Sequence, residues 1–302
     1  MRIEMLKLEN ISVSYKDKVV LDNLSFSASD GEIIGVVAPN GTGKTTLFNV
    51  MANFLKPNKG TVTINDRLQY KKEKNELEIH KLLATFPEQS DLFEELSGVD
   101  HMKLYANMWK GSTKHVKEIY KQLQMESYVK KKVKTYSLGM RQRLCFAMIA
   151  AADTPIMLMD EVMNGLDVAN VSLLSNHLMQ MKKDGKLIFV ASHLLENLDL
   201  YADRVIYLRD GNIVHEQKLN DTDQEYIKVE LTPEKYETFS KKYALPNHHL
   251  YIAERLCCLP IADMDAAELE EWIQRLLPFK EKEITIGPLG TVENYEKYYH
   301  ES

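Results

Sequence analysis

Alternating hydrophobic and polar positions mark the first thirty residues of the chain. Alternation with a period of two is typical of strands that bury one face. It covers residues 2 to 8, 10 to 15 and 24 to 28, and a turn sequence at residues 15 to 18 leads into a further predicted strand at residues 19 to 21. Asp30-Gly31 is a second turn sequence, of the kind that closes hairpins. We therefore expect an antiparallel β subdomain at the start of the chain.

Unbroken apolar runs replace this alternation further along. Such runs are typical of strands that are buried on both faces of a parallel sheet. They cover Ile33–Val37, Leu82–Phe86, Ile156–Met159, Leu187–Ala191 and Val205–Leu208. Helical periodicity dominates between about residues 90 and 150, with Met102, Tyr105, Met108 and Trp109 predicted on one helix face. The pattern predicts an α/β core, a parallel sheet flanked by helices, with an inserted helical subdomain.

The pattern changes again beyond residue 220. Strand and helix signals follow in the order β-α-β-β-α-β, over residues 226–231, 233–243, 249–261 for two strands, 266–277 and 283–286. This order is that of a split βαβ unit. A short last helix is predicted in the tail, residues 290–300. We therefore expect two domains, residues 1–220 and a small α+β domain of residues 221–302.

Composition narrows the classes of function. The formal net charge of −6 argues against a general nucleic-acid-binding protein, so no nucleic-acid partner is expected. Lysines at 114, 117, 121, 130, 131, 132 and 134 are interpreted as a solvated helix face. The three cysteines form no C-x-x-C pair, which favours a reducing, cytoplasmic compartment. The N-terminus has no signal-peptide pattern, and no apolar stretch approaches the roughly 20 residues that span a bilayer. We expect any membrane role to depend on a partner.

A glycine-punctuated turn, APNGTGKTT, follows the apolar run Ile33–Val37 and precedes a helical pattern. Gly41 and Gly43 allow the backbone N–H groups to approach an anion closely, and the helix N-terminus faces the same anion. Lys44 adds a full positive charge, and the Thr45 hydroxyl can ligate magnesium. This is the strand, turn and helix context of a P-loop. Ala38 replaces the first glycine of the usual pattern, which requires a backbone angle that an L-residue can adopt.

Two acids end the apolar run Ile156–Met159. A buried strand gains nothing in packing from Asp160 and Glu161, so their place at its carboxyl end points to the ligand crevice of an α/β sheet. In a magnesium–nucleotide site the first acid can hold the metal, and the second can orient and deprotonate the attacking water. The other interpretation is that the two acids cap a following helix.

Between these motifs lies Tyr136-Ser137-Leu138-Gly139-Met140, followed by Arg-Gln-Arg and an apolar helix. With this segment the chain resembles the nucleotide-binding subunit of an ATP-binding cassette (ABC) transporter, a P-loop NTPase. The family signature is usually LSGGQ, and YSLGM keeps only Ser137 and Gly139, the small polar pair at a helix N-terminus. The YSLGM form is similar to exporters that include bacitracin-resistance and lantibiotic-immunity transporters.

The resemblance implies a set of roles over residues 1 to about 220. Tyr15 would stack on adenine, Asp167 would lie in the loop that crosses a dimer interface, and His193 would contact the γ-phosphate. Either Glu88 or Gln89 would take the place of the magnesium-sensing glutamine, and the choice between them stays open. Nucleotide contacts are implied for Asn40, Gly41, Thr42, Gly43, Lys44, Thr45, Thr46, Ser137 and Gly139, with magnesium at Thr45 and Asp160.

The function that the resemblance implies is ATP hydrolysis that powers transport, with ATP and Mg²⁺ as cofactors. Ser137 and Gly139 would close over ATP on a second nucleotide-binding subunit, in a homodimer or a heterodimer. A separate polytopic membrane permease would carry the substrate, which places this chain peripherally on the cytoplasmic face of the membrane. The alternative is a soluble ABC-type ATPase that acts as a nucleotide-gated binding module in translation or DNA repair. A RecA-like enzyme would leave YSLGM and His193 unexplained.

Overall fold

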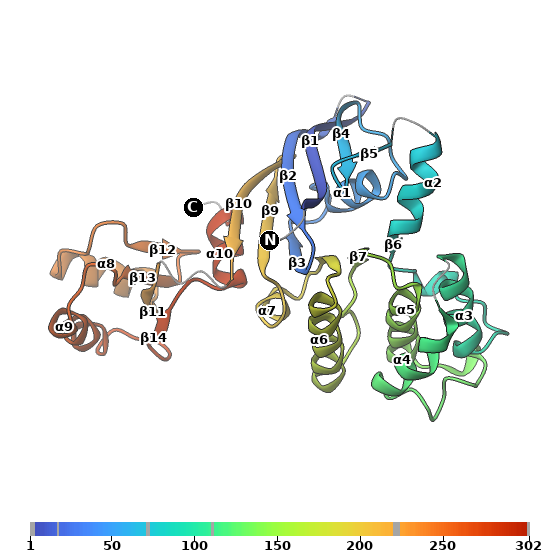
Figure 1. Cartoon of the computed structure of the whole chain (residues 1–302). Coiled ribbons are helices and arrows are strands. Elements are labelled where there is room, and N and C mark those ends of the chain that lie inside the picture. The colour runs from blue at the N-terminus through green and yellow to red at the C-terminus, as the bar shows by residue number, and fades with distance from the viewer. Residues whose placement is uncertain (1–3, 17, 71–72, 110–111, 220–223, 301–302) are drawn as a thin grey trace. The chain divides into compact units, whose positions relative to one another are not determined.

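The computed structural model describes residues 4–16, 18–70, 73–109, 112–219 and 224–300 (Figure 1). It divides into two compact units, Met1–Gln217 and Lys218–Ser302. The predicted boundary between residues 220 and 221 lies outside the described residues, three positions beyond this division.

An antiparallel sheet opens the N-terminal unit. Its strands, in the spatial order β2-β1-β4-β5, are β1 (Glu4–Tyr15), β2 (Lys18–Ser29), β4 (Lys59–Ile64) and β5 (Leu68–Gln69). The sequence predicts four short strands up to residue 28, whereas the structure has two long ones. The alternation is interrupted because Asn10 and Asn23 adopt a left-handed conformation, with φ of 53° and 50°, inside β1 and β2. The β1–β2 register shifts between Leu8 and Ile11, as at a β-bulge.

A six-stranded sheet forms the centre of this unit. Its order is β10-β9-β3-β8-β7-β6, and the four pairs from β9 to β6 are all parallel. The strands are β3 (Glu32–Val37), β6 (Leu83–Thr85), β7 (Ile156–Asp160), β8 (Leu187–Ala191), β9 (Arg204–Arg209) and β10 (Asn212–Lys218). Every residue of β3 and β8 is buried, which explains their unbroken apolar sequence.

Each face of the central sheet has its own cover. One buried cluster joins its strands to the antiparallel sheet and to α1 (Lys44–Met51), through residues such as Phe26, Leu47 and Phe189. The helices α5 (Leu138–Ala152) and α6 (Val168–Lys183) lie on the other side of the strands (Figure 1). The short helix α7 (Leu195–Leu198) lies against β3, where Leu198 approaches Gly35, whereas α2 (Glu73–Leu82) packs beside β5 and β6 and joins the first cluster through Ile79.

The inserted helical part contains α3 (Gly98–Met108), α4 (Val116–Gln122) and the first turns of α5, with short 3-10 helices η1 (Gln89–Asp91), η2 (Thr113–His115) and η3 (Val133–Thr135). Met102 is fully buried, but Met108 is 60% exposed, so the predicted four-residue buried face is wrong at this position. The cause is the helix end, because Trp109 is already the C-cap and turns inward to donate from Nε1 to the carbonyl of Leu83 at 2.9 Å.

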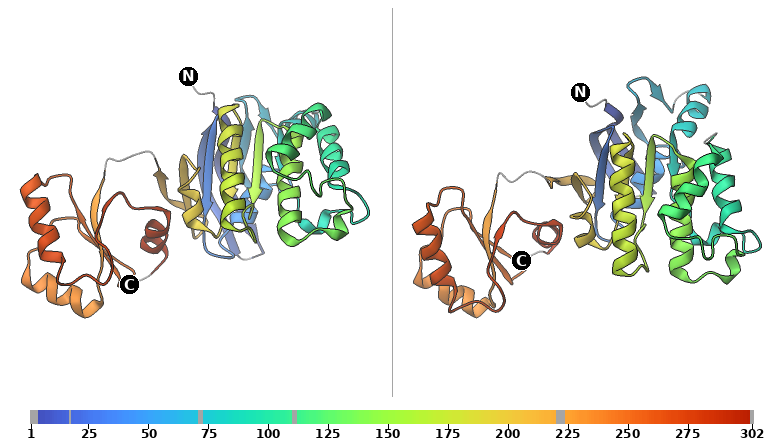
Figure 2. Two further views of the ribbon diagram at one scale, coloured as in Figure 1. Left: turned by 90° about the horizontal axis from the view of Figure 1, so that it is seen from below. Right: turned by 60° about the horizontal axis from the view of Figure 1, so that its bottom comes forward.

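The C-terminal unit has the predicted order of elements. It contains β11 (Tyr226–Glu230), α8 (Pro233–Lys242), β12 (Leu250–Ile252), β13 (Leu256–Pro260), α9 (Ala266–Leu276), β14 (Thr285–Gly287) and α10 (Thr291–Tyr299). The sheet order β12-β13-β11-β14, with every pair antiparallel, is that of a split βαβ unit. Figure 2 shows α8 and α9 on one side of this sheet and α10 on the other.

An apolar cluster packs on each face of the C-terminal sheet. The face toward α8 and α9 packs around Phe239 and Leu276, and the opposite face packs around Cys258 and Leu289. Among the described residues, no helix is both long and apolar enough to cross a membrane.

Candidate functional site

Three neighbouring strands bring the candidate chemistry to one edge of the central sheet. In the order β3-β8-β7 these strands are parallel, so their carboxyl ends meet at the same edge. The P-loop follows β3, Ser192 and His193 follow β8, and Glu161 follows β7. Residues that lie more than a hundred positions apart in sequence are thus placed around one crevice, where α/β sheets bind ligands.

The loop from Ala38 to Gly43 turns tightly before α1. Gly41 and Gly43 have φ of 75° and 112°, in the region that favours glycine, and a Cβ at Gly43 would lie 3.0 Å from the carbonyl oxygen of Val20. Ala38 has no positive φ, as an L-residue requires. Its carbonyl oxygen accepts a 2.9 Å hydrogen bond from Nζ of Lys44, which folds the lysine back along the loop.

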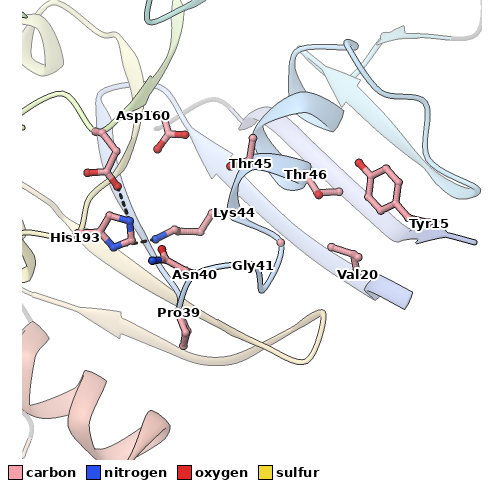
Figure 3. A pocket seen from close by; sticks show the side chains of 12 residues that line it. Tyr15, Val20, Pro39, Asn40, Gly41, Lys44, Thr45, Thr46, Asp160 and His193 are labelled. Atoms are coloured by element: carbon pink, nitrogen blue, oxygen red, sulfur yellow. Dashed lines mark hydrogen bonds and ion pairs between the residues drawn. The ribbon is translucent and has the colours of Figure 1, made fainter. Parts of the chain in front are cut away.

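A pocket of 440 Å³ opens over this loop (Figure 3). It is lined by Tyr15, Val20, Pro39, Asn40, Gly41, Gly43, Lys44, Thr45, Thr46, Asp160, Glu161 and His193. Tyr15 is half-exposed at the end of β1, with its ring at the far side of the pocket from the acids. Thr42 turns away, since its hydroxyl donates to the carbonyl of Pro39 at 2.6 Å.

His193 connects the positive and negative sides of the pocket. Its Nδ1 lies 3.5 Å from Nζ of Lys44, and its Nε2 lies 3.1 Å from Oε1 of Glu161 (Figure 3). Apart from this ion pair, the buried carboxylate of Glu161 receives no side-chain hydrogen bond within the described residues. A buried carboxylate with a single ionic partner is costly, so it is expected to receive a proton or a further donor from a ligand.

Burial sets the ionisation of the pocket. It raises the pKa of Asp160 and Glu161 above the usual carboxyl range, although the attraction of nearby His193 and Lys44 opposes the rise. It lowers the pKa of Lys44, against the attraction of the same two carboxylates. Opposed shifts of this kind, in a crevice and with specific charged partners, are typical of a functional site.

The pocket fits a magnesium ion that arrives with phosphates. Within the described parts of the chain, no three or more His, Cys, Asp and Glu side chains form a group that could hold a metal ion. Thr45 and Asp160 line the pocket together, and both offer the oxygen ligands that magnesium prefers. Magnesium usually keeps several waters and shares its remaining positions between one or two carboxylates and substrate phosphates.

Glu88 and Gln89 line a second cavity of 670 Å³, which shares Thr45, Asp160 and Glu161 with the first. Glu88 caps η1, with its Oε2 accepting from the hydroxyl of Ser90 at 3.1 Å. Gln89 instead reaches toward α5 and donates from Nε2 to Oε1 of Gln142 at 2.5 Å. The sequence left open which of these two residues takes the place of the magnesium-sensing glutamine. The structure distinguishes them, because Glu88 makes its hydrogen bond within its own loop, whereas Gln89 makes its hydrogen bond to a residue of α5.

Ser137, Gly139 and Asp167 do not line either cavity. Ser137 is the exposed N-cap of α5, and Asp167 is the N-cap of α6, with Oδ1 accepting from the N–H of Asn170 at 2.8 Å. The segments that carry them touch, because a Cβ at Gly165 would lie 3.0 Å from Leu138 and a Cβ at Gly139 would lie 3.8 Å from Leu166. They form an open surface that presents a helix N-terminus.

Gln142 was given no role by the sequence. It is 4% exposed, and its Nε2 donates to the backbone carbonyls of Glu161 and Val162 at 2.9 and 3.0 Å. The only sequence signal is the place of Gln142 one turn after Gly139 on an apolar helix. This signal does not reveal the two carbonyls that Gln142 binds, because Glu161 and Val162 lie about twenty residues further on.

Comparison with known proteins agrees with this geometry. The family model described as ABC transporter matches residues 21–164. An uncharacterised ABC transporter ATP-binding protein of Bacillus subtilis, YhcH, is 34% identical over 72% of this chain and 71% of its own length. The SkfA peptide export ATP-binding protein SkfE, also of Bacillus subtilis, is 30% identical over 71% of this chain and 89% of its own. The lantibiotic transport ATP-binding protein SrtF of Streptococcus pyogenes is 27% identical over 71% and 91%.

Solved structures agree as well. The ATP-binding cassette MJ0796, described as dimeric in a post-hydrolysis state with bound ADP and Pi, matches with a TM-score of 0.63 and 25% identity. The match covers 72% of this chain and 100% of that one.

Proposed function

Because the chain belongs to the ABC transporter family as an ATP-binding subunit with the ATPase fold, we propose that ATP hydrolysis in the 440 Å³ pocket powers export through a separate membrane subunit. The observation that carries this proposal is the placement of Lys44, His193 and Glu161 in one pocket at the ends of β3, β8 and β7. The relation to a peptide-export protein and a lantibiotic transport protein supports export over the soluble alternative.

The residues of the pocket divide the work. The P-loop N–H groups and Lys44 hold the β- and γ-phosphates, and Tyr15 stacks on the base. Glu161 takes the proton of the attacking water, since its carboxylate lines the pocket and is held by His193 through Oε1. His193 lies between Lys44 and Glu161, where it can steady charge that develops on the γ-phosphate.

Thr45 and Asp160 would hold magnesium together with the phosphates, and the metal would supply neutralising charge there. Gln89 is the better candidate for the loop residue that responds to the metal. Its amide Nε2 is bonded to Gln142 beside Glu161, whereas the carboxylate of Glu88 is occupied in capping η1.

A second subunit completes the site. Ser137 and Gly139 lie on an open surface outside both cavities, so they are suited to close over a nucleotide held by another copy. The intact P-loop and the intact Ser137–Gly139 pair in one chain support a homodimer, and a dimeric relative of the same fold is known.

The membrane subunit is proposed to dock at the 670 Å³ cavity. The cavity joins the P-loop side to the inserted helices, and it is lined by aromatic side chains that include Phe54, which is 67% exposed. A partner seated there would touch Gln89 directly and could respond to the nucleotide through it. The chain would then work peripherally on the cytoplasmic face of the membrane.

Glu161→Gln tests the proposed function. The variant keeps the size of the side chain but cannot accept a proton, so it should bind ATP and dimerise while its turnover falls at least roughly a hundredfold. Single-turnover hydrolysis and size-exclusion chromatography with Mg-ATP measure the two properties. Gln180→Ala, which removes an exposed amide on α6, is the matched control and should behave like the parent. A Glu161→Gln variant that hydrolyses ATP at the parental rate would remove Glu161 from its assigned role.

A further inference from the structure

A buried amide joins three segments that the proposed reaction uses. Gln142 lies on α5, one turn after the Ser137–Gly139 pair, and is 4% exposed. Its side chain makes three hydrogen bonds, to Gln89 in the loop after β6 and to the carbonyls of Glu161 and Val162 after β7. An amide side chain can take part in about four such bonds, so this one is nearly saturated.

The direction of these hydrogen bonds follows from the partners. Two backbone carbonyls face one end of the Gln142 amide, and a carbonyl can only accept, so that end must be the NH₂ group. The other end is therefore the oxygen. Gln89 must present its own NH₂ group to this oxygen, at 2.5 Å, which turns its carbonyl oxygen away from Gln142. The position of Gln89 is thus linked to the backbone at Glu161.

The backbone at Glu161 needs support. Its φ is 53°, a left-handed conformation that an L-residue other than Asn or Asp rarely adopts. Such residues persist where the surroundings over-determine them, typically at functional sites. Here the N–H of Glu161 donates to the carbonyl of Ala191 at 2.9 Å, and its carbonyl accepts from Gln142. The peptide group before Glu161 is thus hydrogen-bonded to β8, the strand before His193, and the peptide group after Glu161 is hydrogen-bonded to α5.

We propose that Gln142 is a positioning residue that fixes the Glu161 backbone and makes it follow the position of Gln89. The inference rests on the proposed function, because it concerns the carboxylate assigned there as the base. A movement of Gln89, caused by a nucleotide or by a membrane partner, is transmitted through one amide to the carboxylate. Since α5 carries both Gln142 and the Ser137–Gly139 surface, the same amide ties that surface to the base.

The consequence is a defect in turnover without a defect in binding. Lys44 and the P-loop hold the nucleotide, and none of them contacts Gln142 through a hydrogen bond that the structure contains. Loss of the amide should therefore displace Glu161 and leave the phosphate cradle in place. A misplaced general base lowers kcat, whereas the dissociation constant for ATP reflects the cradle.

The test uses the full-length chain with Mg-ATP. Gln142→Met keeps the length of the side chain but donates nothing, and Gln142→Ala removes it. Each is made alone and together with Gln89→Ala, with Gln180→Ala as the control for loss of a glutamine amide. We expect kcat to fall at least about tenfold in both Gln142 variants, with the dissociation constant for ATP within about threefold of the parental value.

The double variant tests the link to Gln89. If Gln89 acts through Gln142, Gln89→Ala should lower kcat by a smaller factor in the Gln142→Met background than in the parent. If the factor by which Gln89→Ala lowers kcat is the same in the Gln142→Met background as in the parent, the link is overturned. A kcat of Gln142→Met within about twofold of the parental value would overturn the positioning role. ATP binding by Gln142→Met reports that it is folded, so slow turnover there is not a folding defect.

The two proposals fail in different ways. A parental chain that binds ATP without hydrolysing it, or a Glu161→Gln variant as fast as the parent, contradicts the proposed function. A parent that hydrolyses ATP through Glu161 while the Gln142 variants match it contradicts only the present inference.

Discussion

At the scale of single residues, the local sequence reports chemistry well and backbone geometry poorly. The P-loop and the Asp160-Glu161 pair could be predicted because each motif is contiguous and carries its own strand, turn or helix signal. The left-handed backbone of Glu161 could not, because it is held by Ala191 and Gln142, which lie far away in sequence. The choice between Glu88 and Gln89 also depended on a partner that only the fold supplies.

The ionisation of the two acids predicts the acid limb of the pH profile. Burial raises the pKa of Asp160 and Glu161 in the nucleotide-free pocket. A base works only when ionised, so kcat/KM should fall as the pH drops through this raised pKa, at a higher pH than for an ordinary glutamate. The pH dependence of kcat/KM measures it, because this ratio reports the free enzyme. An acid limb at or below pH 4.5 would contradict the prediction.

At the scale of elements, the unbroken apolar runs predicted the parallel strands correctly. The interrupted alternation predicted four short strands where the structure has the two long antiparallel strands β1 and β2. An alternating pattern assumes that every residue pairs in register. The register shifts in β1 and the left-handed asparagines violate that assumption, so two long strands look like four short ones. The edge strand β10 was not predicted, because its burial alternates between exposed and half-buried positions and provides little apolar signal.

The start of β3 offers a prediction about stability. Oδ2 of Asp203 accepts from the N–H of Ile33 at 2.9 Å, and Oδ1 accepts from Nζ of Lys182 at 2.5 Å. Asp203→Ala leaves a buried N–H without a partner and should destabilise the N-terminal unit by about 1–3 kcal/mol. Asp203→Asn can keep the bond to Ile33 and should lose less. Asp22→Ala, at an exposed position of β2, is the control.

The measurement can be confined to one unit. The two tryptophans are divided between the units, Trp109 in the first and Trp272 in the second. In a Trp272→Phe background, urea unfolding followed by tryptophan fluorescence therefore reports the N-terminal unit alone. Equal midpoints for Asp203→Ala and the control Asp22→Ala would show that the bond to Ile33 does not stabilise this unit.

At the scale of the whole molecule, the sequence predicted two domains and the structure has two compact units. The N-terminal unit contains both halves of the proposed composite site, on separate surfaces. The formal charge is distributed unequally, since residues 218–302 contain 17 acidic and 10 basic residues and thus account for the negative balance of the chain. The long-range order of strands in each sheet could not be read from the sequence, because strand neighbours are chosen by tertiary packing.

The composite site predicts complementation between two inactive variants. Lys44→Ala removes the phosphate contact, and Ser137→Arg blocks the opposite surface. Each alone should be nearly inactive, whereas a mixed dimer has one site built only from unaltered surfaces. An equimolar mixture should regain up to about a quarter of the parental ATPase rate, since half of randomly formed dimers are mixed. Colorimetric phosphate release measures this, and a mixture no more active than its components would contradict a homodimeric composite site.

The C-terminal unit has both faces of its sheet covered by its own helices, and its apolar clusters draw on residues between Tyr226 and Leu289 alone. In terms of gene architecture, it is therefore a transferable cassette. A crossover in the segment after β10 would leave the strand pairing and apolar packing of β11 to α10 intact. ATP-binding subunits of this family could thus acquire, exchange or lose such a unit in one recombination event.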